Sequence, residues 1–245
     1  MDGTAERHIV IEGAYNIRDL GGYHTPVGPT RYRRVLRADG LHRLGQPQLD
    51  QLRNEGVGTV IDLRRAEELA HAPNPFSARS DVRYHNISLF EQLAPTDYKG
   101  DVLHEIYVLA LTSRQAQLRA ILGVIAGAED GAVLFHCTAG KDRTGIVAAL
   151  LLGLAGVTPE DIVEDYAMTG ALIAPMIEEM VDVARSRGRD IEKFRPMLRC
   201  DPETMTATLL YIEQNFGTME RYLETIGVSQ SEMDALRRRL LSESA

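Results

Sequence analysis

The sequence predicts an α/β fold with a largely parallel sheet, because segments typical of strands alternate along the chain with segments typical of helices. Two of the strand segments, residues 57–63 and 132–135, are dense apolar runs of the kind that parallel sheets bury between helices. Hydrophobic residues make up 44% of the chain, which is enough for a large core, and the absence of Trp makes that core mainly aliphatic.

The N-terminal half supplies the first elements of this pattern. Residues 7–12 alternate around Ile9 and Ile11 and predict a strand. Residues 16–22 predict a turn that ends in two glycines, whose backbone reaches conformations closed to other residues. The next expected elements are a strand at 30–38, a helix at 46–54, a strand at 57–63, a short helix at 66–70 and a strand at 82–89.

The C-terminal half is mainly helical. Thr158 followed by Pro159, and the capping box formed by Ser229 and Glu232, mark two helix starts. The expected elements are a helix at about 102–111, a helix from a Thr112 or Ser113 cap to about 126, the strand at 132–135, a buried helix at 146–154, and helices at about 159–168, 171–186, 202–215, 218–225 and 229–241.

We expect a single domain over residues 1–245, with an α/β core at about 1–170 and a helical extension at about 171–245. An apolar stripe at helical spacing lies in the extension, and such stripes are usually core. The alternative is that the segment at about 171–200 is a lid, or an exposed face that meets lipid or a partner. The stripe consists of Met176, Ile177, Met180 and Val181.

Charge and apolar content limit the partners and the compartment. A formal net charge of −8 argues against a nucleic-acid-binding protein, although four arginines between residues 31 and 37 allow a locally positive pocket. The N-terminus lacks the apolar stretch of a signal peptide, and the longest apolar run, 146–154, is too short for stable membrane insertion. With two cysteines and no disulfide framework, the default expectation is cytoplasmic, and export without a classical signal peptide is the alternative.

Residues 131–145 combine a strand, a short polar loop with a cysteine and an arginine, and a helix start. In such an arrangement the N–H groups of the loop and the positive end of the helix dipole converge on one point, which makes an anion site. The same field would stabilise a thiolate at Cys137 and make it a nucleophile near neutral pH. Arg143 can present its planar guanidinium to two oxygens of a tetrahedral anion. Together these features indicate phosphoryl transfer to sulfur.

The stretch resembles the signature of cysteine-dependent phosphatases, in which His-Cys is followed by five residues and then by Arg, Ser or Thr, and Gly; here it spans residues 136–145. The Gly-Lys-Asp before the arginine is similar to a bacterial branch of tyrosine and dual-specificity phosphatases that are lipid-phosphatase-like. Companion motifs at residues 16–22 and 60–64 resemble segments of the same branch. The resemblance covers about residues 10–170. It implies a protein-tyrosine-phosphatase-like fold, with helices flanking a mostly parallel sheet and a helical C-terminal part.

The resemblance also implies roles for the loop residues. Thr144 corresponds to the hydroxyl that assists departure of the thiolate when a phosphocysteine intermediate breaks down. Lys141 is similar to loop cations of phosphoinositide phosphatases, with a solvated lysine as the alternative. His136 is expected to bury its ring and support Cys137, with direct proton transfer as the alternative. The phosphate-binding loop would comprise Thr138, Ala139, Gly140, Lys141, Asp142 and Arg143.

Four residues outside the loop are candidates to support the site. Asp62 and Arg64 lie at the carboxyl end of a strand, where α/β sheets collect functional groups. Asp62 is expected either to position Arg143 or contact substrate, or to be a structural carboxylate that holds loop N–H groups. Arg18 and Asp19 are expected either to form a salt-bridged turn or to face the pocket, with Arg18 on the substrate.

A thiol phosphatase needs a proton donor for the leaving oxygen and a base for the attacking water. In many relatives an aspartate on a mobile loop before the cysteine does both, and Asp97 and Asp101 stand in such a loop here. In the similar branch the aspartate directly precedes the arginine, which is Asp142. We expect Asp142 to be the acid, because it lies on a rigid element and a bound phosphate of like charge favours its protonated form. The alternatives are Asp97, Asp101, Asp62 and a purely structural Asp142 that caps its helix.

No metal or cofactor is implied. His42, His85 and His104 lack ligand spacing, and the thiolate mechanism uses no metal. The loop also lacks the Gly-Lys-Ser/Thr ending of a nucleoside-triphosphate-binding loop. Cys200 is expected to be inert, with a redox partnership with Cys137 as the alternative.

The expected function is a cysteine-dependent phosphatase that hydrolyses phosphomonoesters through a phosphocysteine intermediate. Its substrates would be phosphotyrosine in proteins, phosphoinositides, or both. One alternative is a non-catalytic phosphate-binding module, although a binder does not need the thiol. Another is a different reaction on the same loop, such as arsenate reduction, for which Cys200 would have to supply the second thiol.

Overall fold

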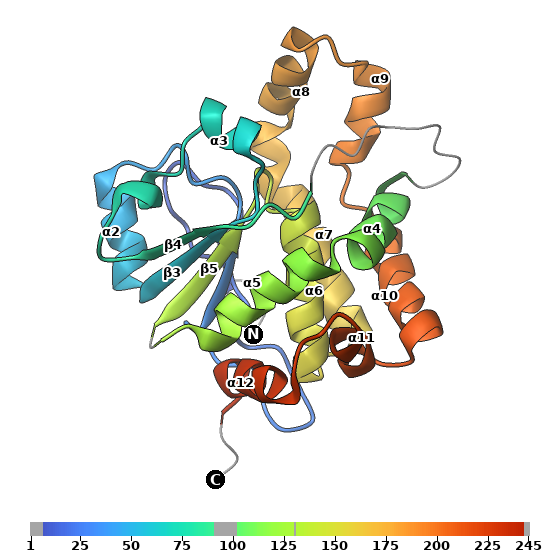
Figure 1. Cartoon of the computed structure of the whole chain (residues 1–245). Coiled ribbons are helices and arrows are strands. Elements are labelled where there is room, and N and C mark those ends of the chain that lie inside the picture. Colours follow the sequence, from blue (N-terminus) through green and yellow to red (C-terminus); the bar gives the residue numbers. More distant parts are fainter. Residues whose placement is uncertain (1–6, 91–101, 130, 243–245) are drawn as a thin grey trace.

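A computed structural model of the chain describes residues 7–90, 102–129 and 131–242. Within these ranges the fold is a five-stranded sheet in the order β1-β2-β5-β3-β4, with helices on both faces (Figure 1). The edge strand β1 is antiparallel to β2, and the other neighbouring strands are parallel, which confirms the predicted α/β class. The strands are β1 (Arg18–Asp19), β2 (Val35–Ala38), β3 (Val57–Asp62), β4 (Arg83–Asn86) and β5 (Ala132–His136).

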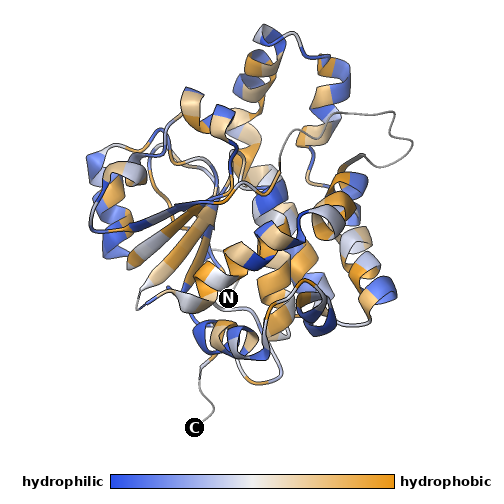
Figure 2. Ribbon diagram, viewed as in Figure 1, coloured by the Kyte–Doolittle hydropathy of each residue, from blue (hydrophilic) through white to orange (hydrophobic). Residues whose placement is uncertain are grey.

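Strand β5 lies in the middle of the sheet, and its side chains alternate between two apolar cores. Val133 and Phe135 belong to the larger core, whereas Ala132 and Leu134 belong to the smaller one. All five residues of β5 are buried, as its dense apolar run predicted. Figure 2 shows the same hydrophobic character in β5 and in the central helix α6.

The larger core joins the sheet to helices from the middle and the end of the chain. Because the C-terminal helices α10, α11 and α12 contribute to this core together with α4, α5, α6 and α7, residues 202–240 share one apolar interior with the α/β part. These helices are α4 (Val102–Ser113), α5 (Gln115–Gly127), α6 (Asp142–Ala155), α7 (Pro159–Ile173), α10 (Pro202–Phe216), α11 (Met219–Thr225) and α12 (Gln230–Leu240).

The smaller core lies on the other face of the sheet, under α2 (Gln46–Asn54) and the N-terminal segment. The short helices α3 (Ala66–His71) and η1 (Pro75–Ala78) connect β3 to β4. Among the described helices, none has both the length and the apolar character needed to span a membrane.

A helical arm, which we define as residues 174–198, extends from the end of α7 at the top of Figure 1. It comprises η2 (Ala174–Met176), α8 (Ile177–Ser186), α9 (Ile191–Phe194) and η3 (Arg195–Leu198). The base of the arm packs against Ala139 through a third apolar cluster that includes Ile173 and Met176. Part of the predicted apolar stripe is therefore core, as Met176 and Val181 are buried.

Two expectations for the N-terminal region are wrong. Residues 7–12 do not form a strand, because His8 makes a single bridge to Arg18 while Ile9 and Ile11 pack into the smaller core. The strand expected at 30–38 begins at Val35, since Arg33 adopts a left-handed φ of 58° that interrupts the extended chain. The edge of the sheet is instead occupied by β1, from the segment expected to be a turn.

The helical boundaries also differ from expectation. Helix α7 continues through Gly170 to Ile173, and Pro175, which has no N–H to donate, separates it from α8. Helix α5 begins at Gln115 without a side-chain cap, because α4 runs through Ser113. Helix α9 was not predicted, and the Asp190 side chain caps its start.

Candidate active site

The loop of residues 137–143, hereafter the 137–143 loop, joins β5 to α6 at the carboxyl ends of three parallel strands. His136 ends β5 and is in register with Ala38 of β2 and Asp62 of β3. Cys137 follows and is 2% exposed, and α6 begins at Asp142. Because the helix starts inside the loop, the positive end of its dipole faces the loop residues.

The N–H groups of the loop are available to a ligand. Within the described ranges, the structure shows no protein acceptor for the backbone N–H groups of residues 138–143. Ala139, Gly140 and Lys141 are nevertheless buried, and buried N–H groups without partners are rare in proteins. A row of unpaired N–H groups before a helix is the arrangement that binds phosphate-like anions.

Gly140 and Asn16 fix the shape of the loop. Gly140 has a φ of +66°, and a Cβ there would lie 2.6 Å from the Ala38 carbonyl oxygen and 2.8 Å from Asn16 Nδ2. Asn16 Nδ2 in turn donates to the carbonyl oxygens of Ala139 (3.1 Å) and Gly140 (3.2 Å). The N-terminal motif at 16–22 therefore reaches the loop through Asn16, a contact that the sequence analysis did not assign.

Arg143 is held by a carboxylate that sequence reasoning missed. Its Nη1 and Nη2 donate to the two carboxylate oxygens of Glu68, at 2.7 and 2.9 Å. Glu68 also accepts a hydrogen bond from the Thr138 hydroxyl. Its place in the first turn of the short helix that follows the Asp62–Arg64 strand end does not by itself mark Glu68 as a site residue.

This ion pair stays charged across the neutral range. Burial disfavours the guanidinium, but the negative charge of a Cys137 thiolate and the contacts with Glu68 raise the pKa of Arg143 above its ordinary value. Burial likewise opposes the carboxylate, yet the hydrogen bonds and charge of Arg143 and the Thr138 hydroxyl hold the pKa of Glu68 well below its usual range. The Phe90 ring lies 6.0 Å from the guanidinium and gives the site an aromatic neighbour.

Asp142 is partly exposed and hydrogen-bonded on one oxygen. Its side chain is 28% exposed, and Oδ1 accepts a 2.6 Å hydrogen bond from the Tyr107 hydroxyl. Oδ1 also lies 3.1 Å from Lys141 Nζ. Because the residue opens α6, its carboxylate is close to the unpaired loop N–H groups. Asp97 and Asp101, the alternative acids, lie outside the described residues.

The alternative that Lys141 is a solvated lysine is wrong. The residue is 1% exposed, and Nζ donates to the carbonyl oxygens of Met197 (2.5 Å) and Arg199 (2.9 Å). With Asp142 as the third neighbour, the three ammonium protons each face a protein oxygen. Lys141 therefore joins the 137–143 loop to the end of the helical arm.

A buried polar cluster lies beneath the loop. The Asp62 carboxylate accepts hydrogen bonds from Arg64, the shortest at 2.7 Å, and its Oδ2 lies 3.2 Å from His136 Nε2. Asn74 Nδ2 is 2.8 Å from both Asp62 Oδ2 and His136 Nε2. In the described part of the chain, Asp62 makes no hydrogen bond to Arg143, and its geometry favours the supporting role over contact with substrate. The His136 ring is fully buried.

Arg18 and Asp19 belong to two separate networks. Arg18 donates to the backbone oxygen of Asp165 on α7 at 2.8 Å and lies 3.4 Å from its carboxylate. Asp19 accepts a hydrogen bond from the Gly21 N–H at 2.9 Å. The mutual pair does not form among the described residues, because Arg18 pairs with Asp165 while Asp19 forms a salt bridge with Arg33 at 3.3 Å. Burial lowers the pKa of Arg18 to about 10, although the Asp165 charge opposes this shift.

Arg37 links this network to the loop. It shares Asp165 with Arg18 and donates from Nη2 to the carbonyl oxygen of Gly140 at 2.7 Å. Two buried arginines with one carboxylate leave excess positive charge behind the anion-binding loop. Arg37 is one of the four arginines between residues 31 and 37, and its contact with the loop was not predicted.

For two predicted residues, the contacts within the described ranges assign no role. Thr144 is fully buried at the start of α6, and its hydroxyl has no hydrogen-bond partner in the described ranges. Cys200 is partly buried, and burial raises the pKa of its thiol to about 11. The described residues contain no cluster of three or more His, Cys, Asp or Glu side chains arranged to hold a metal ion.

A buried cysteine, an arginine six positions later and a loop whose N–H groups have no acceptor among the described residues, set between a central strand and a helix, form the arrangement expected of a phosphatase. The chain belongs to the tyrosine phosphatase family, which matches residues 9–242. This match includes the C-terminal helices, beyond the residues in which sequence motifs were found. The protein is accordingly a phosphatase that acts on phosphorylated substrates.

Three relatives support this assignment. A tyrosine-protein phosphatase of Nostoc commune is 37% identical over 216 residues, covering 84% of this chain and 73% of the relative. A putative tyrosine-protein phosphatase of Cupriavidus necator is 30% identical over 244 residues, covering 89% and 83%. The triple specificity protein phosphatase PtpB of Mycobacterium tuberculosis is 27% identical, covering 94% and 98%. A crystal structure of TpbA from P. aeruginosa is 18% identical with a TM-score of 0.31, covering 67% of this chain and 86% of that one.

Proposed function

We propose that the protein hydrolyses phosphomonoesters through a phosphocysteine formed on Cys137. The observation that carries this proposal is the row of unpaired N–H groups at residues 138–143, which begins beside the buried thiol and ends at Arg143. Such a cradle stabilises the equatorial oxygens of a phosphoryl group during transfer. A thiol at its base is then placed to attack phosphorus.

Each step has a residue available to it. The Cys137 thiolate attacks phosphorus while the loop N–H groups and the guanidinium of Arg143 hold the transferring group. Asp142 gives its proton to the leaving oxygen as the P–O bond breaks, and the carboxylate then takes a proton from the water that hydrolyses the phosphocysteine. The Thr144 hydroxyl assists departure of the thiolate. Asp62 and His136 hold the strand end beneath the loop.

The test is release of inorganic phosphate by wild type and by Cys137→Ser, in reductant and without added metal. Turnover by wild type and its loss in the variant support the thiol mechanism. A non-catalytic binding module would release no phosphate in either form, while both would still bind vanadate or phosphate. That result would reject the proposal.

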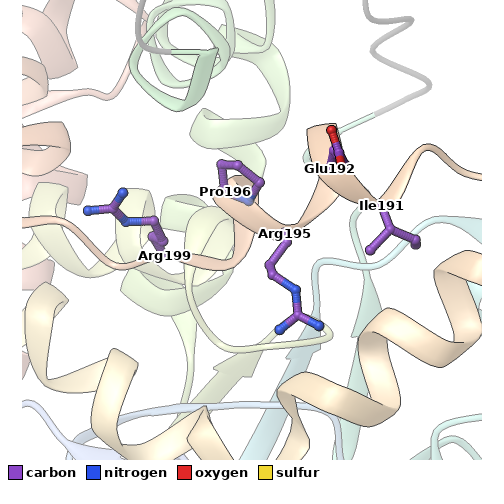
Figure 3. A pocket seen from close by; sticks show the side chains of 5 residues that line it. All are labelled: Ile191, Glu192, Arg195, Pro196 and Arg199. Atoms are coloured by element: carbon purple, nitrogen blue, oxygen red, sulfur yellow. The ribbon is translucent and has the colours of Figure 1, made fainter.

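The substrate class is the second part of the proposal. We infer that phosphotyrosine in proteins and phosphoinositides are both substrates, because one relative is named a triple specificity phosphatase and because two arginines line a cavity near the end of the helical arm. This cavity of about 620 Å³ is lined by Ile191, Glu192, Arg195, Pro196 and Arg199 (Figure 3). It lies at the end of the helical arm that Lys141 joins to the loop.

The two arginines of this cavity are exposed and paired with single carboxylates, Arg195 with Glu178 and Arg199 with Asp201. Such exposed pairs are weak, so both guanidinium groups can exchange their partner for further phosphates of a substrate. Arg195→Ala with Arg199→Ala should lower kcat/KM for a phosphoinositide more than for a phosphotyrosine peptide. Arg185→Ala, on the same arm and also paired with a carboxylate, is the control. Equal losses on the two substrates would argue against the lipid part of the proposal.

A further inference from the structure

Two buried tyrosine hydroxyls lead to the carboxylate of Asp142. The Tyr107 hydroxyl, from α4, is 2.6 Å from Asp142 Oδ1, and the Tyr166 hydroxyl, from α7, is 2.9 Å from that of Tyr107. Tyr107 is 0% and Tyr166 is 1% exposed, and their rings meet edge to face at 6.1 Å. No local motif marks either residue in the sequence.

The available protons fix the direction of the hydrogen bonds from Tyr166 through Tyr107 to Asp142. A carboxylate can only accept, so Tyr107 uses its single hydroxyl proton on Asp142. The hydrogen bond between the tyrosines must then be donated by Tyr166. Burial raises the pKa of both tyrosines above the ordinary value, followed by the charge of Asp142 as the next cause. Both hydroxyls are therefore protonated and able to donate in the neutral range.

We propose that Tyr107, supported by Tyr166, is a positioning residue for Asp142 that holds Oδ1 and leaves Oδ2 to carry and transfer the proton. This inference rests on the proposed role of Asp142 as general acid. Tyr107 and Lys141 both approach Oδ1, whereas within the described residues no hydrogen bond involves Oδ2. The bond to Oδ1 is compatible with both states, since a protonated carboxyl still accepts at its other oxygen.

The proton balance follows from this geometry. As the S–P bond forms and the P–O bond breaks, the proton on Oδ2 passes to the leaving oxygen and Asp142 becomes a carboxylate. Tyr107 and Lys141 stabilise that negative charge on Oδ1. When water attacks the phosphocysteine, Oδ2 accepts a proton from it, and inorganic phosphate and the thiolate are released with Asp142 protonated again. Tyr107 keeps its own proton throughout.

The test is Tyr107→Phe, measured as kcat/KM on two aryl phosphates with different leaving groups. Phenyl phosphate needs a proton on its basic leaving oxygen, whereas p-nitrophenyl phosphate has an acidic leaving group that departs with little help. We expect a loss of roughly tenfold on phenyl phosphate and of less than about twofold on p-nitrophenyl phosphate, from one charge-assisted hydrogen bond. Tyr166→Phe should give a smaller loss with the same substrate dependence. Equal losses on both substrates, or no loss on either, would overturn the proposal.

Two controls distinguish loss of Asp142 positioning from two other causes. These are a general effect of removing a buried hydroxyl and a wrong assignment of the general acid. Tyr222→Phe removes another fully buried tyrosine hydroxyl, which donates to the Leu111 carbonyl oxygen at 2.9 Å, and should leave both kcat/KM values unchanged. Adding Tyr107→Phe to Asp142→Asn should cause no further loss of kcat/KM, because the two residues act as one unit. If Asp142→Asn itself shows no dependence on the leaving group, the acid assignment fails and the role of Tyr107 fails with it. If Asp142→Asn does depend on the leaving group, but the losses from Asp142→Asn and Tyr107→Phe add in the double variant, only the role of Tyr107 is rejected.

Discussion

Glu68 and Arg143 are joined by two parallel hydrogen bonds, one from each terminal nitrogen of the guanidinium. The same carboxylate accepts from Thr138, so Glu68 ties together the first and last residues of the anion cradle. A guanidinium held in this way has its orientation set before the substrate binds. We therefore expect Glu68 to act through Arg143 and not by contact with the reacting atoms.

Glu68→Ala should lower kcat/KM by roughly tenfold to a hundredfold, because the largely buried Arg143 loses a charge-assisted, two-point hydrogen bond. Glu68→Gln should lose less, since an amide oxygen still accepts one bond. The matched control is Glu67→Ala, an exposed neighbour in the same helical turn, which should be close to wild type. Activity is measured on p-nitrophenyl phosphate, and an unchanged kcat/KM in Glu68→Ala would contradict the role of the ion pair.

Asp62→Asn should destabilise the protein by about 3 kcal/mol, because it leaves the buried Arg64 and His136 facing a neutral side chain. Urea unfolding at pH 7 measures this loss. Asp50→Asn removes an exposed carboxylate that pairs with Arg79, and it should change stability little. A similar stability for the Asp62 and Asp50 variants would count against a structural role for Asp62.

The same substitution should reduce the dependence of stability on acid pH. Burial alone would raise the pKa of Asp62, but the charge and hydrogen bond of His136, with those of Arg64, hold it below its usual range. A depressed folded-state pKa contributes stability above the unfolded value of about 3.9, and that stability is lost as pH falls toward the folded value. Wild type should therefore lose more unfolding free energy than Asp62→Asn between about pH 5 and pH 3. Parallel curves of unfolding free energy against pH for wild type and Asp62→Asn would refute this.

Gly140→Ala should nearly abolish activity and lower stability. Its Cβ would lie 2.6 Å from the Ala38 carbonyl oxygen, so the loop must move away from β2. Gly188→Ala is the matched control, because Gly188 has a similar φ of +71° but no atom within 4 Å of an added Cβ. The control isolates backbone strain of about 1 kcal/mol, and the excess loss at Gly140 measures the steric contact. Thermal unfolding and phosphate release are the two readouts.

Cys200→Ser should retain phosphate release. Burial raises the pKa of the Cys200 thiol to about 11, which leaves little thiolate at neutral pH. Wild-type Cys200 should correspondingly react with iodoacetamide more slowly than a free thiol at pH 7.5, as followed by mass spectrometry. Loss of turnover in the serine variant would instead point to a reaction with two thiols, such as arsenate reduction.

Sequence patterns predicted the parts of the fold that rest on local chemistry. The apolar runs of β3 and β5 and the capping box at Ser229 were recovered because their periodicity and caps are visible in short windows. The strand expected at 7–12 failed because its alternation reflects packing against a face of the sheet and not pairing within it. Local patterns do not distinguish these two forms of burial.

The same distinction between local sequence patterns and contacts made by the fold applies to the site. The 137–143 loop is a continuous motif, so Cys137 and Arg143 could be named as candidates from sequence alone. Glu68 and Tyr107 are ordinary helical residues until the fold brings them to the loop, and no spacing marks them. The burial of Lys141 could not be foreseen for the opposite reason, because its loop position allows a solvated lysine while the distant residues 197 and 199 accept its hydrogen bonds.

The contact between Asn16 and Ala139 spans 123 positions of the chain, and that between Arg37 and Gly140 spans 103. Strands β2 and β5 pair over a comparable separation, Val35 with Val133, so the loop takes its geometry only where the sheet itself has formed. The geometry of this short loop thus depends on contacts with residues that are distant in the sequence. Enzymatic activity should consequently vanish before helical content during gradual denaturation, and it reports on the integrity of the entire chain more sensitively than any spectroscopic measure of secondary structure.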